Sequence, residues 1–355
     1  MPPTDDRLAS ATTAAGPLAT VSCEAARENR KTNQRAGWAA REFAANQRDK
    51  AMASHRIWQP LPDLGIRPKF GFSSTEKVFA MGSCFAREVE DALAALGFDV
   101  PTRCDDLFST PLMQAAANAK GVRPRSYLNR YNTMSLHDEV RHLLGLDPAL
   151  EQGALTYGLD NNTAADLHYT QSLPQVGVLP TIDRRRIVRD HLGARLRDSR
   201  VFVFTLGMAE CWYDSAAGRY LNNTPGPRVM AAYGDRLEVH MTRFAQHLEA
   251  IEKTHAVLTQ ALGPDIRVII TVSPVPLELS FQEDDVVQTN LYSKSMLRAV
   301  AQEFAANHGN VDYFPSYEFV SVASPQTSWA WDYRHVKPGL VEHIMNVFRT
   351  HYVTE

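Results

Sequence analysis

A short apolar run in the first third of the chain passes directly into a helical pattern, and this junction most constrains the fold. Residues 78–81 (VFAM) form the kind of continuous apolar segment that a strand buried on both faces shows. After Gly82 and Ser83, apolar side chains recur at helical spacing until Gly97 supplies a stop. The sequence therefore predicts a strand, a sharp turn and a helix, with a serine at the turn.

Ser83 stands where the expected helix begins, and this position allows two interpretations. The amides in the first turn of a helix lack internal acceptors and carry the positive end of the helix dipole, so they can hold an anion. A hydroxyl group there is a candidate nucleophile beside half of an oxyanion hole. The alternative is an N-cap, a role that serine commonly fills. Cys84 is interpreted as a small buried packing residue.

The rest of the chain alternates expected strands with expected helices. The strands lie at residues 97–100, 201–207, 266–272 and 311–314, and the helices at 135–144, 181–198, 242–262, 290–308 and 339–351. Alternation at this spacing predicts an α/β fold with a mostly parallel sheet covered on both faces, a three-layer α/β/α sandwich. Sites in such sheets lie at the carboxyl ends of strands, where Ser83, Gly207 and Ser273 all stand.

The chain is expected to have an arm and one main domain. Residues 1–20 are rich in Ala, Thr and Pro and are expected to be disordered. A helical composition with few apolar anchors follows. We therefore expect residues 1–56 to form a partly disordered helical arm and residues 57–355 to form the α/β domain. In that domain, the charge of the Arg-rich helix at 181–198 is interpreted as a solvated face.

The composition argues against several classes of function. A hydrophobic content of 44% and a charged content of 22% are ordinary for a soluble globular protein, and a net charge of −3 argues against a general nucleic-acid binder. No apolar run approaches the length of a membrane span, and the N-terminus lacks the pattern of a signal peptide. Four scattered cysteines fit a reducing compartment, so a cytoplasmic location is expected.

Phosphate-binding loops and metal-ligand clusters are both missing from the sequence, so neither a cofactor nor a metal is expected. The nearest approach to a histidine pair is His240 with His247, which are expected to face solvent. Nothing in the sequence sets the oligomeric state.

A candidate base for a serine nucleophile, His335, lies near the C-terminus. Such a serine needs a group to take its proton, and that base needs an orienting group. Asp332 and His335 are three residues apart, so one tight loop can bring the carboxylate to the second nitrogen of the imidazole. The alternative is that Asp332 caps a turn and that His335 is a solvated surface residue.

Residues 82–86 (GSCFA) resemble the signature of the GSCFA family, a branch related to the SGNH (GDSL-like) hydrolases. Residues 204–207 (FTLG), 271–276 (TVSPVP), 292–295 (YSKS) and 313–318 (YFPSYE) resemble further blocks of that family, in the same order. The resemblance implies an SGNH-hydrolase-like, flavodoxin-like fold. It also implies a triad of Ser83, Asp332 and His335, because SGNH enzymes carry a D-x-x-H motif at this point in the chain.

The same resemblance implies an oxyanion hole made of the Ser83 amide, Gly207 and a side-chain Asn. Ala209 stands where that Asn is expected. Asn132, in a pair that resembles another block of the family, is a candidate replacement, and a turn residue is the alternative. The departure matters because a missing donor typically costs about 10²–10³ in rate.

Six further residues are expected to line or brace the site: Glu210, Trp212, Ser273, Tyr292, Lys294 and Trp331. The tryptophan rings can stack on sugar rings or acyl groups. Structural bracing is the alternative for each of the six.

The residues and the resemblance together imply a serine-dependent acyl ester hydrolase. Ser83 would attack an ester carbonyl, His335 would carry the proton and Asp332 would orient His335. The expected substrate is a small-molecule or saccharide ester, such as an acetylated saccharide, and neither nucleic acid nor membrane is an expected partner. Two alternatives stay open: an acyltransferase using the same acyl-serine, and a non-catalytic saccharide-binding protein on a hydrolase frame.

Overall fold

A computed structural model describes residues 16–38, 50–114, 123–170 and 172–354. The chain divides by its internal contacts into two units, Met1–Arg56 and Ile57–Glu355. In the first unit, helix α1 (Cys23–Thr32) begins at Ser22, whose side chain accepts a hydrogen bond from the Ala25 amide, and helix α3 (Ala53–Ile57) follows later. Disorder is expected for residues 1–20, and residues 1–15 of this range lie outside the described residues.

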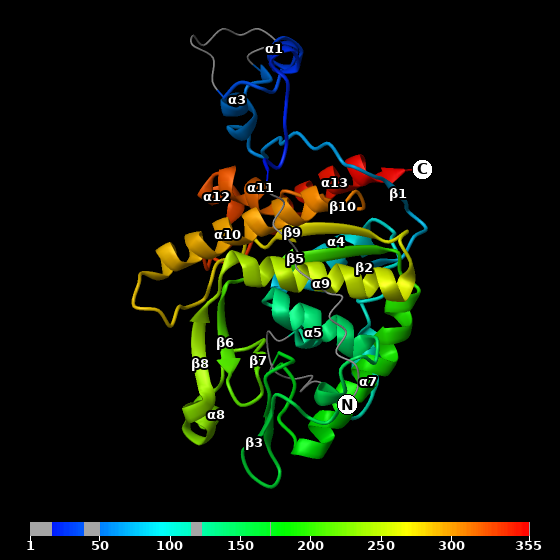
Figure 1. The fold of residues 1–355 in the computed structure, drawn as a ribbon, viewed down its shortest axis with the longest axis vertical. Helices are drawn as coiled ribbons and strands as arrows, with labels where there is room; N and C mark the ends of the chain where they lie inside the picture. Colours follow the sequence, from blue (N-terminus) through cyan, green and yellow to red (C-terminus); the bar gives the residue numbers. More distant parts are fainter. Residues whose placement is uncertain (1–15, 39–49, 115–122, 171, 355) are drawn as a thin grey trace. The chain divides into compact units, whose positions relative to one another are not determined.

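The second unit is built on a four-stranded parallel sheet in the order β10–β9–β5–β2 (Figure 1). Its strands are β2 (Val78–Gly82), β5 (Val201–Leu206), β9 (Arg267–Val272) and β10 (Val311–Tyr313). Every residue of β2 and β5 is buried, as their continuous apolar sequences predict. The prediction of a mixed α/β fold with a mainly parallel sheet is confirmed.

Helices bury both faces of this sheet. Because successive side chains of a strand point to opposite faces, Phe79 and Met81 belong to one core and Val78 and Ala80 to the other. The first core is completed by α5 (Thr133–Leu143), α7 (Val178–Arg197), α9 (Phe244–Leu262) and α10 (Val286–Asn307). The second is completed by α4 (Cys84–Ala95), α11 (Ser316–Val322) and α13 (Pro338–Tyr352).

A small antiparallel sheet, in the order β7–β6–β8, follows β5 in the chain and was not predicted. Its strands are β6 (Glu210–Asp214), β7 (Arg219–Tyr220) and β8 (Leu237–Met241). These strands are short and only partly buried, so their sequences lack the apolar run or the strict alternation that identifies a strand.

The remaining strands of the second unit pair with one another, and three short helices accompany them. They are β1 (Phe72–Ser73) beside β11 (Val353–Thr354), the hairpin of β3 (Thr156–Gly158) and β4 (Ala164–Asp166), and helices α6 (Pro148–Glu151), α8 (Pro227–Tyr233) and α12 (Pro325–Ser328). Within the described ranges, no helix has the length and apolar character needed to cross a bilayer.

Residues 97–100 do not form the predicted strand. The Asp99 carbonyl accepts a hydrogen bond from the Val78 amide at 2.9 Å, but residues 98–100 form no regular ladder. The tight turn after α4, in which the Phe98 amide bonds back to the Leu93 carbonyl, leaves too few residues for one.

Two expectations of solvent exposure are also wrong. Arg185 of the Arg-rich helix is fully buried and makes a two-pronged ion pair with Asp166, at 2.9 and 2.7 Å. His247 is fully buried between the hydroxyl groups of Thr133 and Thr242, at 2.7 and 2.6 Å from its two ring nitrogens. In both cases the polar group is buried because it finds partners from distant parts of the sequence.

Gly82, the last residue of β2, adopts a backbone conformation that requires glycine. Its φ is +143°, and a Cβ built there would lie 2.2 Å from the Thr205 carbonyl oxygen. Gly97 also has a positive φ, +90°, but a Cβ at that position would have open space around it. A substitution at Gly97 therefore tests backbone strain alone, whereas a substitution at Gly82 tests strain together with steric overlap.

We predict that Gly82→Ala lowers the free energy of unfolding by several kcal/mol, whereas Gly97→Ala costs only about 1–2 kcal/mol, the usual penalty for a left-handed non-glycine residue. Denaturant unfolding of the two variants beside the wild type measures both changes. Equal losses would contradict the close approach of β2 and β5 at Gly82.

Candidate functional site

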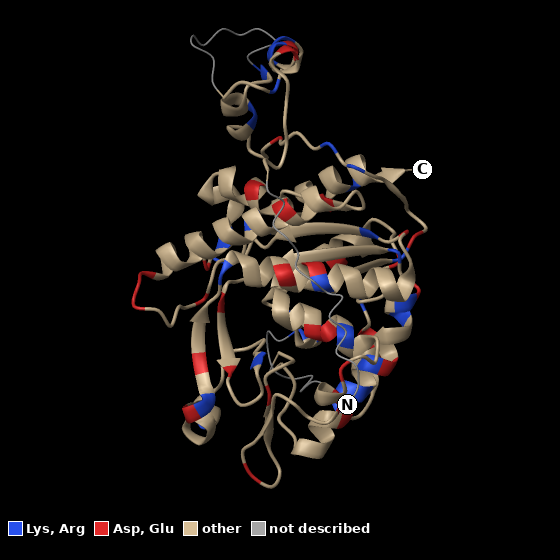
Figure 2. Cartoon of the chain, in the orientation of Figure 1, with Lys and Arg blue, Asp and Glu red and all other residues tan. Residues whose placement is uncertain are grey.

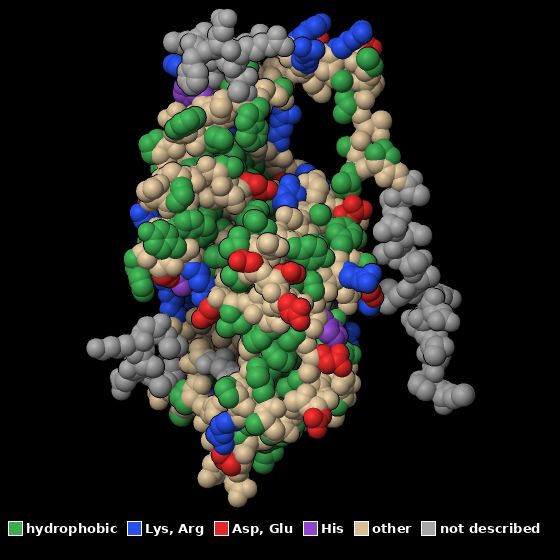
Figure 3. Space-filling model, turned by 90° about the vertical axis from the view of Figure 1, so that its left-hand side faces the viewer, with side chains coloured by type: hydrophobic (Ala, Val, Ile, Leu, Met, Phe, Trp, Pro, Cys, Tyr) green, Lys and Arg blue, Asp and Glu red, His purple; other side chains and the backbone are tan. Residues whose placement is uncertain are grey.

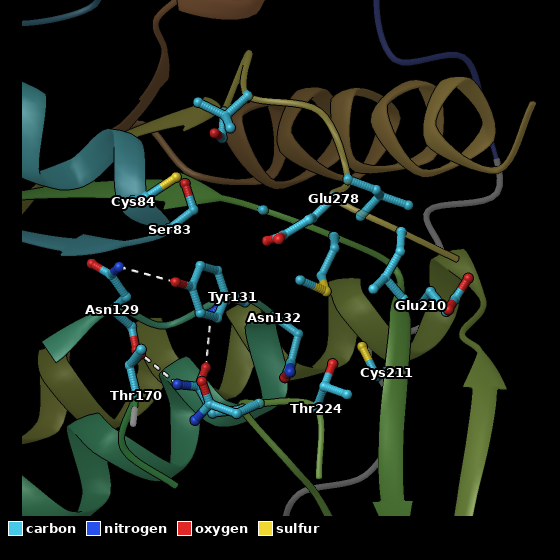
Figure 4. A pocket seen from close by; sticks show the side chains of 18 of the residues that line it. Ser83, Cys84, Asn129, Tyr131, Asn132, Thr170, Glu210, Cys211, Thr224 and Glu278 are labelled. Carbon is cyan, nitrogen blue, oxygen red and sulfur yellow. Dashed lines mark hydrogen bonds between the residues drawn. The ribbon is translucent and has the colours of Figure 1, made fainter. Parts of the chain in front are cut away.

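A cavity of about 570 Å³ opens at the carboxyl ends of β2, β5 and β9. Ser83 follows β2, Gly207 follows β5 and Ser273 follows β9, and all three line this cavity, as the sequence pattern predicts. We call it the main cavity. Figure 4 shows Ser83 and Cys84 on one side of it and Glu210 and Cys211 on the other.

The backbone of Ser83 continues the sheet beyond the end of β2. The Ser83 amide donates to the Thr205 carbonyl at 3.0 Å, and the Gly82 carbonyl accepts from the Arg130 amide at 2.7 Å. The Ser83 amide is therefore committed to the sheet, which corrects its expected place in the oxyanion hole. The next amide, that of Cys84, opens α4, where helix amides have no partner within the helix.

The Ser83 side chain does not cap the helix. Ser83 occupies the N-cap position of α4 in an extended conformation, but its hydroxyl makes no capping hydrogen bond. This hydroxyl is buried and has no hydrogen-bond partner among the described residues. Leaving a buried hydroxyl unpaired costs free energy, so the unpaired state calls for a functional explanation.

Gly207 brings the end of β5 against Ser83. A Cβ at Gly207 would lie 3.2 Å from the Ser83 Cβ and 2.5 Å from the Tyr131 carbonyl oxygen, so only glycine permits this approach. Two further bonds fix the turn: the Met208 amide donates to the Tyr131 carbonyl at 2.9 Å, and Lys294 Nζ donates to the Gly207 carbonyl at 2.7 Å. The Gly207 amide is the second candidate donor to an oxyanion.

Asn132 lines the cavity as the N-cap of α5. Its Oδ1 accepts from the Ser135 amide at 2.8 Å and its Nδ2 donates to the Leu221 carbonyl at 2.9 Å. The side chain is therefore a helix cap, and because the bond to Leu221 uses one of the two N–H groups of Nδ2, its role as a third donor stays a prediction. Ala209 offers its amide to the Ser293 hydroxyl at 2.7 Å and takes no part in the cavity's polar lining.

Asp332 and His335 form a close pair. His335 Nδ1 lies 2.5 Å from Asp332 Oδ2, and the other carboxylate oxygen accepts the His335 amide at 3.0 Å. The bond from the imidazole, followed by the backbone amides of His335 and Arg334, holds the pKa of the Asp332 carboxyl well below its usual range. Asp332 therefore both caps the turn and orients the ring.

The pair and the serine share the main cavity without touching. His335 lines the cavity with Ser83, but its side chain is 57% exposed and the Ser83 hydroxyl makes no bond to it. Catalytic hydrogen bonds are often long or unformed before substrate binds.

Lys294 lies behind the cavity wall, which corrects its expected role as a substrate-binding residue. Its side chain is 1% exposed and its ammonium group is bound to the Gly207 carbonyl. Burial lowers the pKa of Lys294 to about 7; the charge of Arg334 acts in the same direction and Cys84 opposes it. Lys294 thus supports the turn that presents Gly207.

Glu210 and Trp212 line the cavity, and Glu210 acts as a brace. Its two carboxylate oxygens accept from the Ser280 hydroxyl at 2.6 Å and from the Phe281 amide at 2.7 Å. This fixes the Phe281 ring against Trp212, with an edge-to-face centroid separation of 5.0 Å.

The structure does not bring Tyr292 and Trp331 to the main cavity. Their side chains are 49% and 91% exposed, and neither belongs to its lining. Ser273 does line it, and its hydroxyl, like that of Ser83, is buried without a partner in the described part of the chain.

A family model described as GSCFA family matches residues 77–348. The chain belongs to the GSCFA family. The matched range contains all four strands of the parallel sheet and the three residues Ser83, Asp332 and His335. A search of curated proteins finds no match.

Sequence reasoning missed several residues of this GSCFA site. Tyr131 lines the cavity, and its hydroxyl accepts from Asn129 Nδ2 at 3.1 Å (Figure 4). Arg334 lines it from the D-x-x-H loop and pairs with Glu278 at 3.1 Å. Phe281 follows a loop that carries no regular pattern. Of these three residues, Arg334 alone carries a sequence signal that points to the site, namely its position between Asp332 and His335.

Buried charges fix the segment that carries Tyr131. Arg130 is fully buried and pairs with Glu139 at 2.7 Å, and Glu139 is also bound by His168 at 2.7 Å and by the Tyr169 hydroxyl at 2.9 Å. Breaking such a buried pair is costly, so the network holds the Tyr131 carbonyl in place for the Met208 amide.

Cys84 lines the main cavity and also a second cavity of about 510 Å³, which His335 borders as well. Burial raises the pKa of the Cys84 thiol, and the charge of Lys294 only partly offsets this. The thiol is therefore protonated near neutral pH, which makes it a poor nucleophile. Among the described residues, no group of three His, Cys, Asp or Glu is placed to hold a metal ion.

The pKa of Lys294 predicts a dependence of stability on pH. An unfolded lysine keeps its proton up to about pH 10.4, whereas Lys294 loses it near pH 7 in the folded protein. Between these values the unfolded state binds more protons, so this group makes the protein more stable as pH rises. Replacing Lys294 by Met removes that contribution.

We therefore expect the stability of Lys294→Met relative to wild type to fall between pH 7 and pH 10, by up to about 1.4 kcal/mol per pH unit. Denaturant unfolding at several pH values measures the difference. Lys253→Met is the matched control, because the Lys253 side chain is half-exposed. A difference independent of pH for Lys294→Met would show that the ammonium group is not buried as described.

Proposed function

We propose that this GSCFA-family protein is a serine-dependent acyl ester hydrolase. The observation that carries the proposal is the unpaired, buried hydroxyl of Ser83 at the start of α4, in a cavity that it shares with the Asp332–His335 pair. A serine, a histidine and a carboxylate bound to the far side of that histidine are the three groups that acyl transfer through serine requires.

The topology supports an SGNH-like three-layer sandwich as the finer description of the fold. β2 is the edge strand of the sheet, and segment 98–100 contacts its free edge through the bond from the Val78 amide to the Asp99 carbonyl. If that segment counts as a strand, it lies beside β2 on one side and β5 lies beside β2 on the other. The chain then passes from β2 to this edge segment first and crosses to the other side of β2 to form β5 afterwards. Ligands of open α/β sheets bind at such a reversal, and Ser83 and Gly207 stand there.

In the proposed mechanism, Ser83 Oγ attacks the carbonyl carbon while His335 Nε2 accepts the hydroxyl proton. Asp332, bound to His335 Nδ1, stabilises the resulting imidazolium. The amides of Cys84 and Gly207 stabilise the oxyanion, replacing the Ser83 amide and the absent asparagine. His335 then protonates the leaving alcohol, and water releases the acyl group from Ser83 by the reverse sequence.

His335 must approach Ser83 for this mechanism to operate. The exposed position of its side chain permits such an approach, since His335 and Ser83 border the same cavity. The alcohol portion of the ester, such as a saccharide, would then lie in the second cavity, which His335 also borders.

An acyltransferase is the second candidate function, and the second cavity favours it. This cavity meets the main cavity at Cys84 and His335, so an acceptor alcohol held there would be adjacent to an acyl group on Ser83. Product analysis with and without an added alcohol distinguishes transfer from hydrolysis.

We predict that a fluorophosphonate probe labels Ser83, and that Ser83→Ala abolishes both labelling and ester turnover. His335→Ala should lower kcat/KM by about 10²–10⁴, the usual contribution of a general base, and Asp332→Asn should have a smaller effect because the imidazole remains. Mass spectrometry of the labelled protein and ester assays provide the measurements.

Cys84→Ala is the matched control, since it alters the neighbouring side chain but leaves the hydroxyl. It should retain activity. Loss of activity in Cys84→Ala but not in Ser83→Ala would make the protein a thiol enzyme. The absence of both labelling and turnover would favour the non-catalytic saccharide-binding alternative.

A further inference from the structure

We propose, resting on the hydrolase function above, that the end of the main cavity at Trp212 and Phe281 binds an apolar acyl chain. The substrates would then be uncharged esters of acyl groups longer than acetyl.

Most of the polar groups that lack partners lie at the end of the cavity near Ser83. Asn129 Oδ1 and the hydroxyl groups of Thr170 and Ser273 line the cavity and are buried without a partner among the described residues. Asn222 has no acceptor position left, because it accepts from the Tyr131 amide at 2.8 Å and from the Ser135 hydroxyl at 3.0 Å.

The far end of the cavity, at Trp212 and Phe281, offers a ligand fewer polar groups. Both oxygens of Glu210 are bound to the loop that carries Phe281. The unpaired polar atom there is the indole nitrogen of Trp212, which is buried without a partner among the described residues. The remaining surface of this end is mainly apolar.

The far wall is made of aromatic and aliphatic side chains. Phe281 packs edge-to-face on Trp212, and the other apolar residues of the lining are Met208, Leu221, Val275, Pro276, Leu277 and Leu279. Phe281 and Leu279 remain 41% and 52% exposed, although Glu210 holds their loop in place. Exposed apolar side chains gathered at the mouth of a cavity are typical of a binding surface.

This wall and the second cavity lie on different sides of the reacting groups. The wall comes from β6 and from the loop after β9, whereas the residues that line the second cavity alone include Arg87, Glu88 and Arg123. Both cavities are bordered by Cys84, Ser126, Thr170, Val275 and His335. An ester whose carbonyl lies beside Ser83 would therefore place its acyl chain at the apolar wall and its alcohol in the polar cavity.

The charge near the mouth restricts the substrate further. The loop between β9 and α10 carries Glu278, Glu283, Asp284 and Asp285 (Figure 2). Figure 3 shows acidic side chains interspersed with hydrophobic ones over the face of the molecule on the left of Figure 1. Arg334, which also lines the cavity, pairs with Glu278, and the other three carboxylates keep this loop acidic. A net acidic loop disfavours anionic esters, so uncharged esters are the better ligands.

The test is the ratio of kcat/KM for p-nitrophenyl hexanoate to that for p-nitrophenyl acetate. We expect the wild type to prefer hexanoate by more than tenfold, because burying each additional methylene favours binding about fourfold. Phe281→Ala and Trp212→Ala should reduce this ratio to less than about threefold. Tyr292→Ala, which removes an exposed aromatic ring outside the cavity, should leave the ratio unchanged.

A preference for acetate, or a ratio that Phe281→Ala and Trp212→Ala leave unchanged, would overturn the acyl-chain inference while the hydrolase function stands. If no ester is turned over, binding of methyl hexanoate and methyl acetate to the Ser83→Ala protein decides the inference by calorimetry. Tighter binding of methyl hexanoate that is lost with Phe281→Ala would support the apolar site without the proposed chemistry. Equal binding of the two esters would overturn it.

Discussion

The hydrogen bond from the Ser83 amide to the Thr205 carbonyl is the constraint on which the rest of the site depends. It extends the pairing of β2 and β5 one residue past the strand end, and Gly82 leaves no room for a side chain there. The Gly82 carbonyl binds the Arg130 amide, so a third segment is fixed to the same point. The serine is consequently part of the rigid sheet, and donors to an oxyanion must come from its neighbours.

Buried charges position the segments that face Ser83. Arg130 with Glu139 fixes the segment before α5, and Lys294 fixes the turn at Gly207. Burying a charge is costly unless hydrogen bonds compensate it. Here the compensating bonds run to Glu139 of the following helix and to the Gly207 carbonyl, so stability and the geometry of the cavity depend on the same contacts.

The sequence predicts the parallel sheet well because its strands are continuous apolar runs. The long helices α9, α10 and α13 are also predicted within a few residues, since Gly and Pro mark their ends. The sheet of β6, β7 and β8 escapes prediction because its half-exposed strands carry no clear period. Because this sheet is not predicted, the apolar wall is not predicted either: it depends on the contact between Trp212 of β6 and Phe281 of a distant loop.

Individual site residues are harder to predict than strands, because their partners are distant in sequence. The motif at Asp332 and His335 is readable because both groups lie on one loop. Three contacts join residues that are roughly 20 to 90 positions apart in the sequence. They are the bonds of Asn132 to Leu221, of Arg185 to Asp166 and of Lys294 to the Gly207 carbonyl. Residue type and spacing alone do not specify them.

Ser83 and His335 lie on parts of the protein that differ in local stability, and this difference affects how the protein responds to denaturant and heat. Ser83 belongs to the buried sheet, whereas the Asp332–His335 loop is exposed and is tied down by few bonds besides its own turn. Local opening of such a loop requires less free energy than global unfolding. Mild denaturant or moderate warming would therefore separate the proposed base from the proposed nucleophile while the sheet persists, and the proposed activity would be lost before the fold.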